Sequence, residues 1–178
     1  MRPKQRNKPH AAGEAPTAVS EASPLYGETY SSSFSKPAAW IVASFGASHK
    51  GGSTIPSPTK LIKIVREGLP IEELDALQGL LGVPIEELAP ILGISKATLH
   101  RRRTGETLTQ SESDRVVRFA KLMGRAVQVL ESPESARRWL KTPQLGLGGE
   151  LPLEYAQTEV GAREVEDLLG RIEFGVYS

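Results

Sequence analysis

The sequence predicts an all-α protein in which two small helical domains follow a mostly disordered tail. From residue 58 on, proline and glycine recur as helix starts and stops, apolar residues recur at three- and four-residue steps, and no segment alternates like a strand. Residues 1–57 are rich in Ser, Pro, Ala and Gly and lack a sustained period, which is typical of disorder. The exception is residues 38–45, which we interpret as a sticky piece of linker or as a short strand or turn that docks on a partner.

The first folded part, residues 58–110, is expected to form a helix-turn-helix domain of short helices. Three of these helices start at a proline and stop at a glycine, the asymmetry that helix termini favour. The fourth starts at a serine that can cap it. The expected helices run from Pro58 to Gly68, from Pro70 to Gly82, from Pro84 to Gly93 and from Ser95 to about Arg103.

The second folded part, residues 111–178, is expected to form a small helical domain. Thr109 and Glu112, just before and at its start, have the spacing of a capping box and open the longest helix. Further helices are expected around Trp139, over residues 153–156 and over residues 159–173. The longest helix carries an apolar stripe that is either core of its own chain or a homodimer interface, and its members are Val116, Phe119, Ala120, Met123, Ala126, Val127 and Leu130.

Residues 85–103 have the spacing of a helix-turn-helix. Ala89 is small enough to let two helices approach, and Gly93, four positions later, supplies the tight turn between them. Ile94 and Leu99 are expected in the shared core, and Ser95 is placed to cap the second helix. The second helix would then lie in the major groove of DNA with its N-terminal end toward the bases.

The second helix of this motif is strongly basic, with four Lys or Arg and no acidic residue between positions 96 and 103. We expect Lys96 and Arg101 to contact base edges or phosphates, and Arg102 and Arg103 to clamp phosphates. Arg102 stands where the motif commonly has an apolar residue, and a charge run on its own is also typical of a solvated helix face. The candidate DNA-binding residues are Ser95, Lys96, Thr98, His100, Arg101, Arg102 and Arg103.

Charge is divided unevenly along the chain. The total of 22 Lys and Arg against 21 Asp and Glu nearly cancels. Residues 1–58 hold six basic and three acidic side chains, residues 59–131 eleven and ten, and residues 132–178 five and eight, so the segments carry +3, +1 and −3. Nucleic acid is therefore a candidate partner for the first two segments and not for the last.

Composition excludes several classes of protein. Without cysteine there is no disulfide framework, thiolate zinc site or cysteine catalysis. The three histidines, His10, His49 and His100, form no ligand cluster, and the pair Glu72 and Glu73 complements a helix dipole. We therefore expect no enzyme, no cofactor and no metal. Since no apolar run has membrane length and no signal peptide is visible, a soluble, cytoplasmic protein is expected.

The C-terminal third carries a specific series of motifs. In order, these are W-L-x-T-P from Trp139, L-G-G from Leu147, P-L from Pro152 and R-I-E-x-G-V from Arg171. The series resembles the toxin-binding domain of the Xre/MbcA/ParS antitoxins, and with the preceding helix-turn-helix the resemblance spans about residues 61–178. It does not cover the first 57 or so residues.

The resemblance implies a type II toxin–antitoxin module whose toxin is a RES-domain protein that consumes NAD or transfers from it. The antitoxin would lay its C-terminal region over the NAD pocket and bind operator DNA. Because helix-turn-helix repressors commonly use two half-sites, we expect a homodimer within a hetero-oligomeric complex. The alternative is a stand-alone repressor with a C-terminal dimerisation or sensing domain. For Val165, Leu168, Leu169 and Ile172 we favour a role in the core of their own domain over toxin contact. The toxin contacts that the resemblance implies are Arg163, Leu168, Arg171, Glu173, Gly175, Val176, Tyr177 and Ser178.

Overall fold

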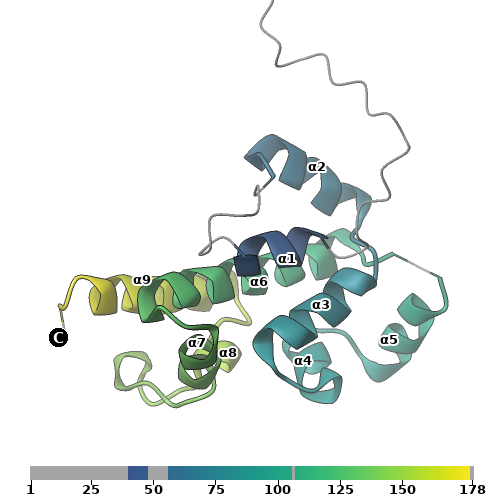
Figure 1. Cartoon of the computed structure of the whole chain (residues 1–178). Coiled ribbons are helices and arrows are strands. Elements are labelled where there is room, and N and C mark those ends of the chain that lie inside the picture. Colours follow the sequence, from purple (N-terminus) through teal and green to yellow (C-terminus); the bar gives the residue numbers. More distant parts are fainter. Residues whose placement is uncertain (1–39, 48–55, 106, 177–178) are drawn as a thin grey trace, which may run out of the picture. The chain divides into compact units, whose positions relative to one another are not determined.

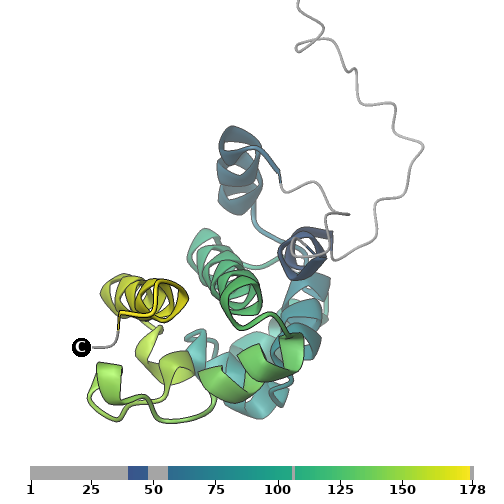
Figure 2. The same cartoon turned by 60° about the vertical axis from the view of Figure 1, so that its left-hand side comes forward.

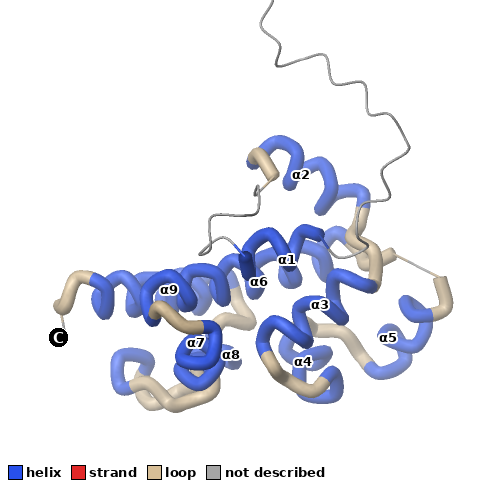
Figure 3. Tube along the Cα trace, in the orientation of Figure 1, coloured by secondary structure: helices blue, strands red, loops and turns tan. Residues whose placement is uncertain are grey.

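The computed structural model describes residues 40–47, 56–105 and 107–176, all in one unit of the chain, residues 35–178. Within these ranges the regular elements are helices and no residue lies in a β-strand, so the predicted all-α class is confirmed (Figure 1 and Figure 3). No helix in the same ranges is long and apolar enough to cross a membrane. Of the predicted disordered tail, residues 1–57, the segments 1–39 and 48–55 lie outside them. The elements are α1 (Trp40–Ala47), α2 (Pro58–Glu67), α3 (Glu72–Leu81), α4 (Ile85–Ile91), α5 (Lys96–Arg103), α6 (Gln110–Leu130), α7 (Pro133–Leu140), the 3-10 turn η2 (Leu145–Leu147), α8 (Pro152–Tyr155) and α9 (Glu159–Glu173).

Helix α6 is the central element of this unit. It packs against α1, α2 and α3, and also against α7 and α9, and Figure 2 shows it between α9 on one side and α1 on the other. The predicted apolar stripe of α6 is buried by these helices, because six of its members are at most 1% exposed and the seventh, Leu130, is half-buried. The stripe is therefore core of its own chain rather than a homodimer interface.

The start of α6 is set by the predicted capping box, which is confirmed. The Glu112 N–H donates to the Thr109 hydroxyl at 3.3 Å, and the Thr109 N–H donates to the Glu112 carboxylate at 2.7 Å. Two backbone N–H groups that a helix start leaves unpaired are thereby satisfied. The same local chemistry starts α9, where the Thr158 hydroxyl accepts the N–H of Gly161 at 3.0 Å.

Helix α1 was not expected from the sequence. Residues 40–47 are helical, and Ile41, Val42 and Phe45 are buried against α3 and α6. The prediction of a sticky linker, or of a short strand or turn, is therefore wrong for this segment. The physical reason is tertiary: positions 41, 42 and 45 share one face of a helix, and burial of that face decides the local structure where propensity does not.

Candidate functional site

Helices α4 and α5 form the helix-turn-helix at the spacing predicted from the sequence. Ala89 is 3% exposed and Ile94 is 2% exposed, as a shared core requires, whereas Leu99 is half-buried. Gly93 makes the turn with φ +70°, a left-handed conformation that favours glycine. The predicted cap is confirmed, since the hydroxyl of Ser95 accepts the Thr98 N–H at 3.1 Å. These contacts fix where α5 begins.

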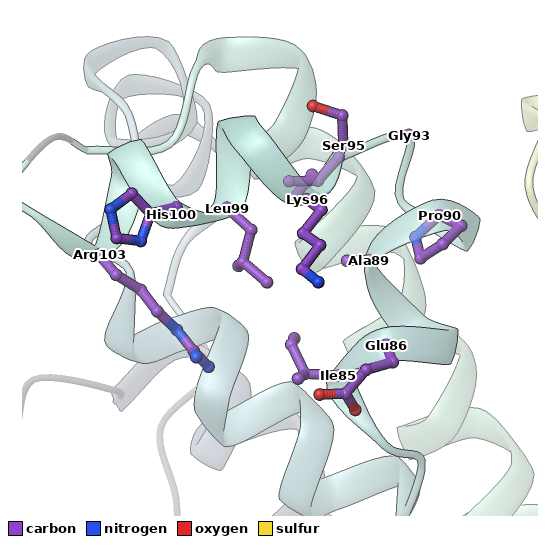
Figure 4. Close-up of a pocket in the computed structure, with 11 residues that line it drawn as sticks. Ile85, Glu86, Ala89, Pro90, Gly93, Ser95, Lys96, Leu99, His100 and Arg103 are labelled. Carbon is purple, nitrogen blue, oxygen red and sulfur yellow. The ribbon is translucent and has the colours of Figure 1, made fainter.

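The outer face of α5 is polar and exposed. Four of its predicted DNA-binding residues, Lys96, His100, Arg101 and Arg103, are exposed together with Ser95 before it, and Thr98 is half-buried with its hydroxyl 2.9 Å from that of Ser95. A cleft of about 530 Å³ separates α5 from α4, and in Figure 4 Lys96 and Leu99 of α5 face Ile85 across it. The basic groups thus lie along one open edge of the helix pair.

The last two arginines of α5 are tied to neighbouring helices. The guanidinium of Arg103 lies 3.2 Å from the Asp75 carboxylate of α3, and both side chains are about half exposed. Arg102 is 8% exposed, and its Nε donates to Glu112 Oε2 at 3.1 Å. This geometry contradicts the predicted phosphate contact of Arg102: the side chain occupies the core position of the motif and its charge is matched within the protein.

The second candidate surface is built from α9 and the segment around η2. Helix α9 lies along α6, where Arg118 pairs with Glu159 at 3.1 Å near one end and Arg125 pairs with Glu173 near the other. Val165 and Leu169 are fully buried in this contact, so the core role is confirmed for them, and Leu168 and Ile172 are half-buried. The turn η2 reaches α9 through Gly146, where an added Cβ would lie only 2.7 Å from Leu168 Cδ1.

The predicted toxin contacts do not form one cluster. Arg163 is exposed and pairs with Glu159 at 3.3 Å, about 15 Å along α9 from Glu173 by the helical rise. The Glu173 carboxylate accepts two hydrogen bonds from Arg125, at 3.3 and 2.5 Å, so its charge is already matched. Arg171 is half-buried, Gly175 and Val176 are exposed, and Tyr177 and Ser178 lie outside the described residues.

Two exposed apolar residues of this surface were missed by the sequence analysis. Leu145 in η2 is 97% exposed and Phe174 just after α9 is 78% exposed, with Val176 at 55%. Phe174 stands outside the buried positions of α9, which is a signal in the sequence, whereas nothing in the sequence distinguishes Leu145 from a core leucine. Phe174 and Val176 stand two positions apart just after α9, and exposed apolar side chains that lie close together are typical of a surface that another protein covers.

The architecture defines a helix-turn-helix protein with a second helical domain that exposes several apolar side chains. Comparison with known families identifies two matching regions in the chain. The pattern described as "Antitoxin Xre-like helix-turn-helix domain" matches residues 60–121. The pattern described as "Antitoxin Xre/MbcA/ParS C-terminal toxin-binding domain" matches residues 125–175. The two matches meet inside α6, the helix that contacts elements of both parts.

This chain matches several curated relatives over most of the relatives' length. An "Antitoxin Xre" of Yersinia enterocolitica is 36% identical over 122 residues, covering 67% of this chain and 82% of the relative. An "Antitoxin Xre" of Photorhabdus laumondii is 36% identical over 117 residues, covering 65% and 79%. A "Prs ADP-ribosylating antitoxin" of Sphingobium sp. is 26% identical over 132 residues, covering 68% and 83%. The chain belongs to the Xre/MbcA/ParS family of type II antitoxins.

Proposed function

We propose that this antitoxin neutralises a RES-domain toxin by laying its C-terminal region over the toxin's NAD pocket. The observation that carries the proposal is the exposure of three apolar side chains, which is 97% for Leu145, 78% for Phe174 and 55% for Val176. The name of the Sphingobium relative adds support, because ADP-ribosylation transfers its group from NAD. In this role the chain is a binding protein without catalysis of its own, in agreement with relatives that are named as antitoxins.

The charge of the C-terminal part suits such a pocket. Residues 132–178 carry three more acidic than basic side chains, whereas a pocket for an anionic dinucleotide presents cationic groups. Glu173 contributes to this charge while its carboxylate stays paired with Arg125. Apolar contacts at Phe174 and Val176 would therefore supply the affinity, and the surrounding carboxylates would orient the antitoxin on the toxin.

A second activity, autoregulation of the operon, is proposed for α5. Ser95, Lys96, Thr98, His100, Arg101 and Arg103 would contact operator DNA, with Arg102 supporting α5 from inside. The exposed basic edge of α5 supports this proposal, and two half-sites on the operator would call for a homodimer. The place of action would be the cytoplasm, where the operator and a toxin from the same operon are found. The alternative, a stand-alone repressor, is disfavoured by the match to a toxin-binding domain.

Coexpression with a RES-domain toxin tests the first proposal. The full chain should form a complex and prevent NAD depletion in growing cells. A chain that ends before Glu173 should keep association through the remaining surface but lose most of the protection, because Phe174 and the residues after it are removed. The full-length variant Glu173→Gln is the matched control, since it weakens the pair with Arg125 while keeping the end of the chain. Full protection by the shortened chain would refute the pocket-covering mechanism.

A further inference from the structure

A buried carboxylate on α3 holds the start of α1. The side chain of Glu73 is fully buried, and its two oxygens accept hydrogen bonds from the N–H groups of Ile41 at 2.9 Å and Val42 at 2.8 Å. Among the described residues it makes no ion pair, so these two amides and the helix dipole are its compensation. Burial raises the pKa of Glu73, although the same hydrogen bonds act to lower it. The two hydrogen bonds therefore offset part of the desolvation cost of burying the Glu73 carboxyl group.

Helix α1 depends on this site for its structure. It has eight residues, about two turns, and helices of that length are marginal in water on their own. Ile41, Val42 and Phe45 are at most 6% exposed when it is docked, and the buried hydroxyl of Ser44 is satisfied by the Ile41 carbonyl at 2.7 Å. Loss of the docking contacts would therefore remove the reason for residues 40–47 to be helical.

The groove beneath α1 is shaped for close approach of a backbone. On α6, a Cβ added at Gly124 would lie 2.9 Å from the carbonyl oxygen of Phe45, closer than side chains tolerate. Glycine at this position lets the end of α1 rest on α6 while Glu73 of α3 holds its start. The start of α1 is thus held by Glu73 of α3, and its end rests against Gly124 of α6.

We propose that α3 and α6 form a receptor groove for α1, and that α1 is a releasable latch that fastens the helix-turn-helix part to the central helix. The occupant is the chain's own α1, which lies before residue 60, where the match to the family begins. When α1 is docked it covers the joint between α3 and α6, and when it is released it leaves that joint open to solvent. The latch is an accessory to the two family domains and does not depend on which toxin they bind.

Amide hydrogen exchange on the full chain tests the latch. Glu73→Gln leaves one acceptor oxygen for two N–H groups, so exchange at Ile41 and Val42 should accelerate on the order of tenfold or more. Exchange in α3 should also accelerate if α1 fastens it. The matched control is Glu72→Gln at the exposed neighbouring position, which should leave both regions unchanged. Unchanged protection of residues 40–47 in Glu73→Gln would overturn the receptor role, and unchanged protection of α3 would overturn the latch.

A second pair of variants keeps the test independent of the carboxylate. Gly124→Ala should displace α1 and accelerate its exchange, whereas Gly79→Ala on α3, where an added Cβ meets no atom within 4 Å, should not. Equal protection in these two variants would overturn the groove assignment. Sedimentation of the same proteins tests the occupant: α1 protection that appears only with concentration-dependent dimerisation would assign the groove to α1 of a second copy and overturn the intrachain latch.

Discussion

Arg102 and Glu112 join the end of α5 to the start of α6. The guanidinium Nε lies 3.1 Å from Glu112 Oε2, and the two side chains are 10% and 9% exposed. The same carboxylate accepts the Thr109 N–H in the capping box of α6. One buried group therefore sets both where the central helix begins and how the proposed DNA-reading helix is attached to it.

Removal of Arg102 should destabilise the fold far more than removal of its neighbour. Arg102→Ala leaves Glu112 buried without its cation, and we expect the free energy of unfolding to fall by about 3 kcal/mol. The control is Arg103→Ala, whose pair with Asp75 is half exposed and is expected to contribute less than about 1 kcal/mol. Urea unfolding of the two variants measures the difference. Equal stability of both variants would contradict the structural role of Arg102.

The contribution of Glu112 should depend on pH. Burial acts to raise its pKa, but hydrogen bonds from the Thr109 N–H and from Arg102 outweigh this and hold the pKa below its ordinary value. As pH falls the unfolded chain binds the proton first, so the stabilisation is complete above about pH 5 and is lost as pH drops through the lowered pKa. The difference in unfolding free energy between wild type and Glu112→Gln, about 1–2 kcal/mol at pH 7, should therefore shrink toward pH 3. A difference that stays constant would contradict this assignment.

Local chemistry explains what could be predicted from the sequence. The caps at Ser95 and Thr109 act within three residues, so the starts of α5 and α6 can be derived from neighbouring letters alone. Helix α1 depends on Glu73, which is 32 positions away from Ile41, and no periodicity in residues 1–57 reveals that contact. The same holds for Arg102, whose burial is decided by a partner on the next helix rather than by its own basic character.

The two candidate surfaces could be predicted to different degrees, because one follows from local spacing and the other depends on long-range contacts. Exposure of Lys96 and Arg101 follows from helical spacing once Leu99 of the same helix is turned toward the core. Exposure of Leu145 depends on whether other segments of the folded chain pack over it, and the local sequence pattern does not reveal that packing. The pairing of Glu173 with Arg125 spans 48 positions and was likewise outside local reasoning.

Lys96 and Arg101 should carry the salt-dependent part of DNA binding. For the double variant Lys96→Ala and Arg101→Ala, we expect affinity for the operon's own promoter to fall about 10- to 100-fold. If both side chains contact phosphates, the slope of log affinity against log salt should also decrease by about 2. The control is Arg163→Ala on α9, which removes an exposed cation far along the chain and should leave the slope unchanged. An unchanged slope and affinity in the double variant would refute the assignment of α5.

The apolar C-terminal surface should be required for toxin binding but not for folding. Leu145→Ser and Phe174→Ser change side chains that are 97% and 78% exposed, so unfolding free energies should stay within about 0.5 kcal/mol of wild type. The toxin complex should weaken at least about tenfold for a residue at the centre of the interface. Val160→Ser is the matched control, because Val160 is 72% exposed at the other end of α9. Calorimetric titration showing equal effects of all three variants would place the toxin elsewhere.

The position of α9 on α8 should depend on the absence of a side chain at Gly161. A Cβ there would overlap the carbonyl oxygen of Tyr155, so Gly161→Ala must push the start of α9 away from the end of α8. Alanine ordinarily favours a helix over glycine by up to about 1 kcal/mol, and this gain should appear in the control Gly170→Ala, where the added methyl group meets no atom within 4 Å. At Gly161 the overlap should dominate and destabilise the protein by about 2 kcal/mol. Thermal unfolding should therefore move the two midpoints in opposite directions. Since α9 leads directly to Phe174, Gly161→Ala should also weaken the toxin complex. Stabilisation of the protein by both alanine substitutions would show that α8 and α9 do not pack as closely as described.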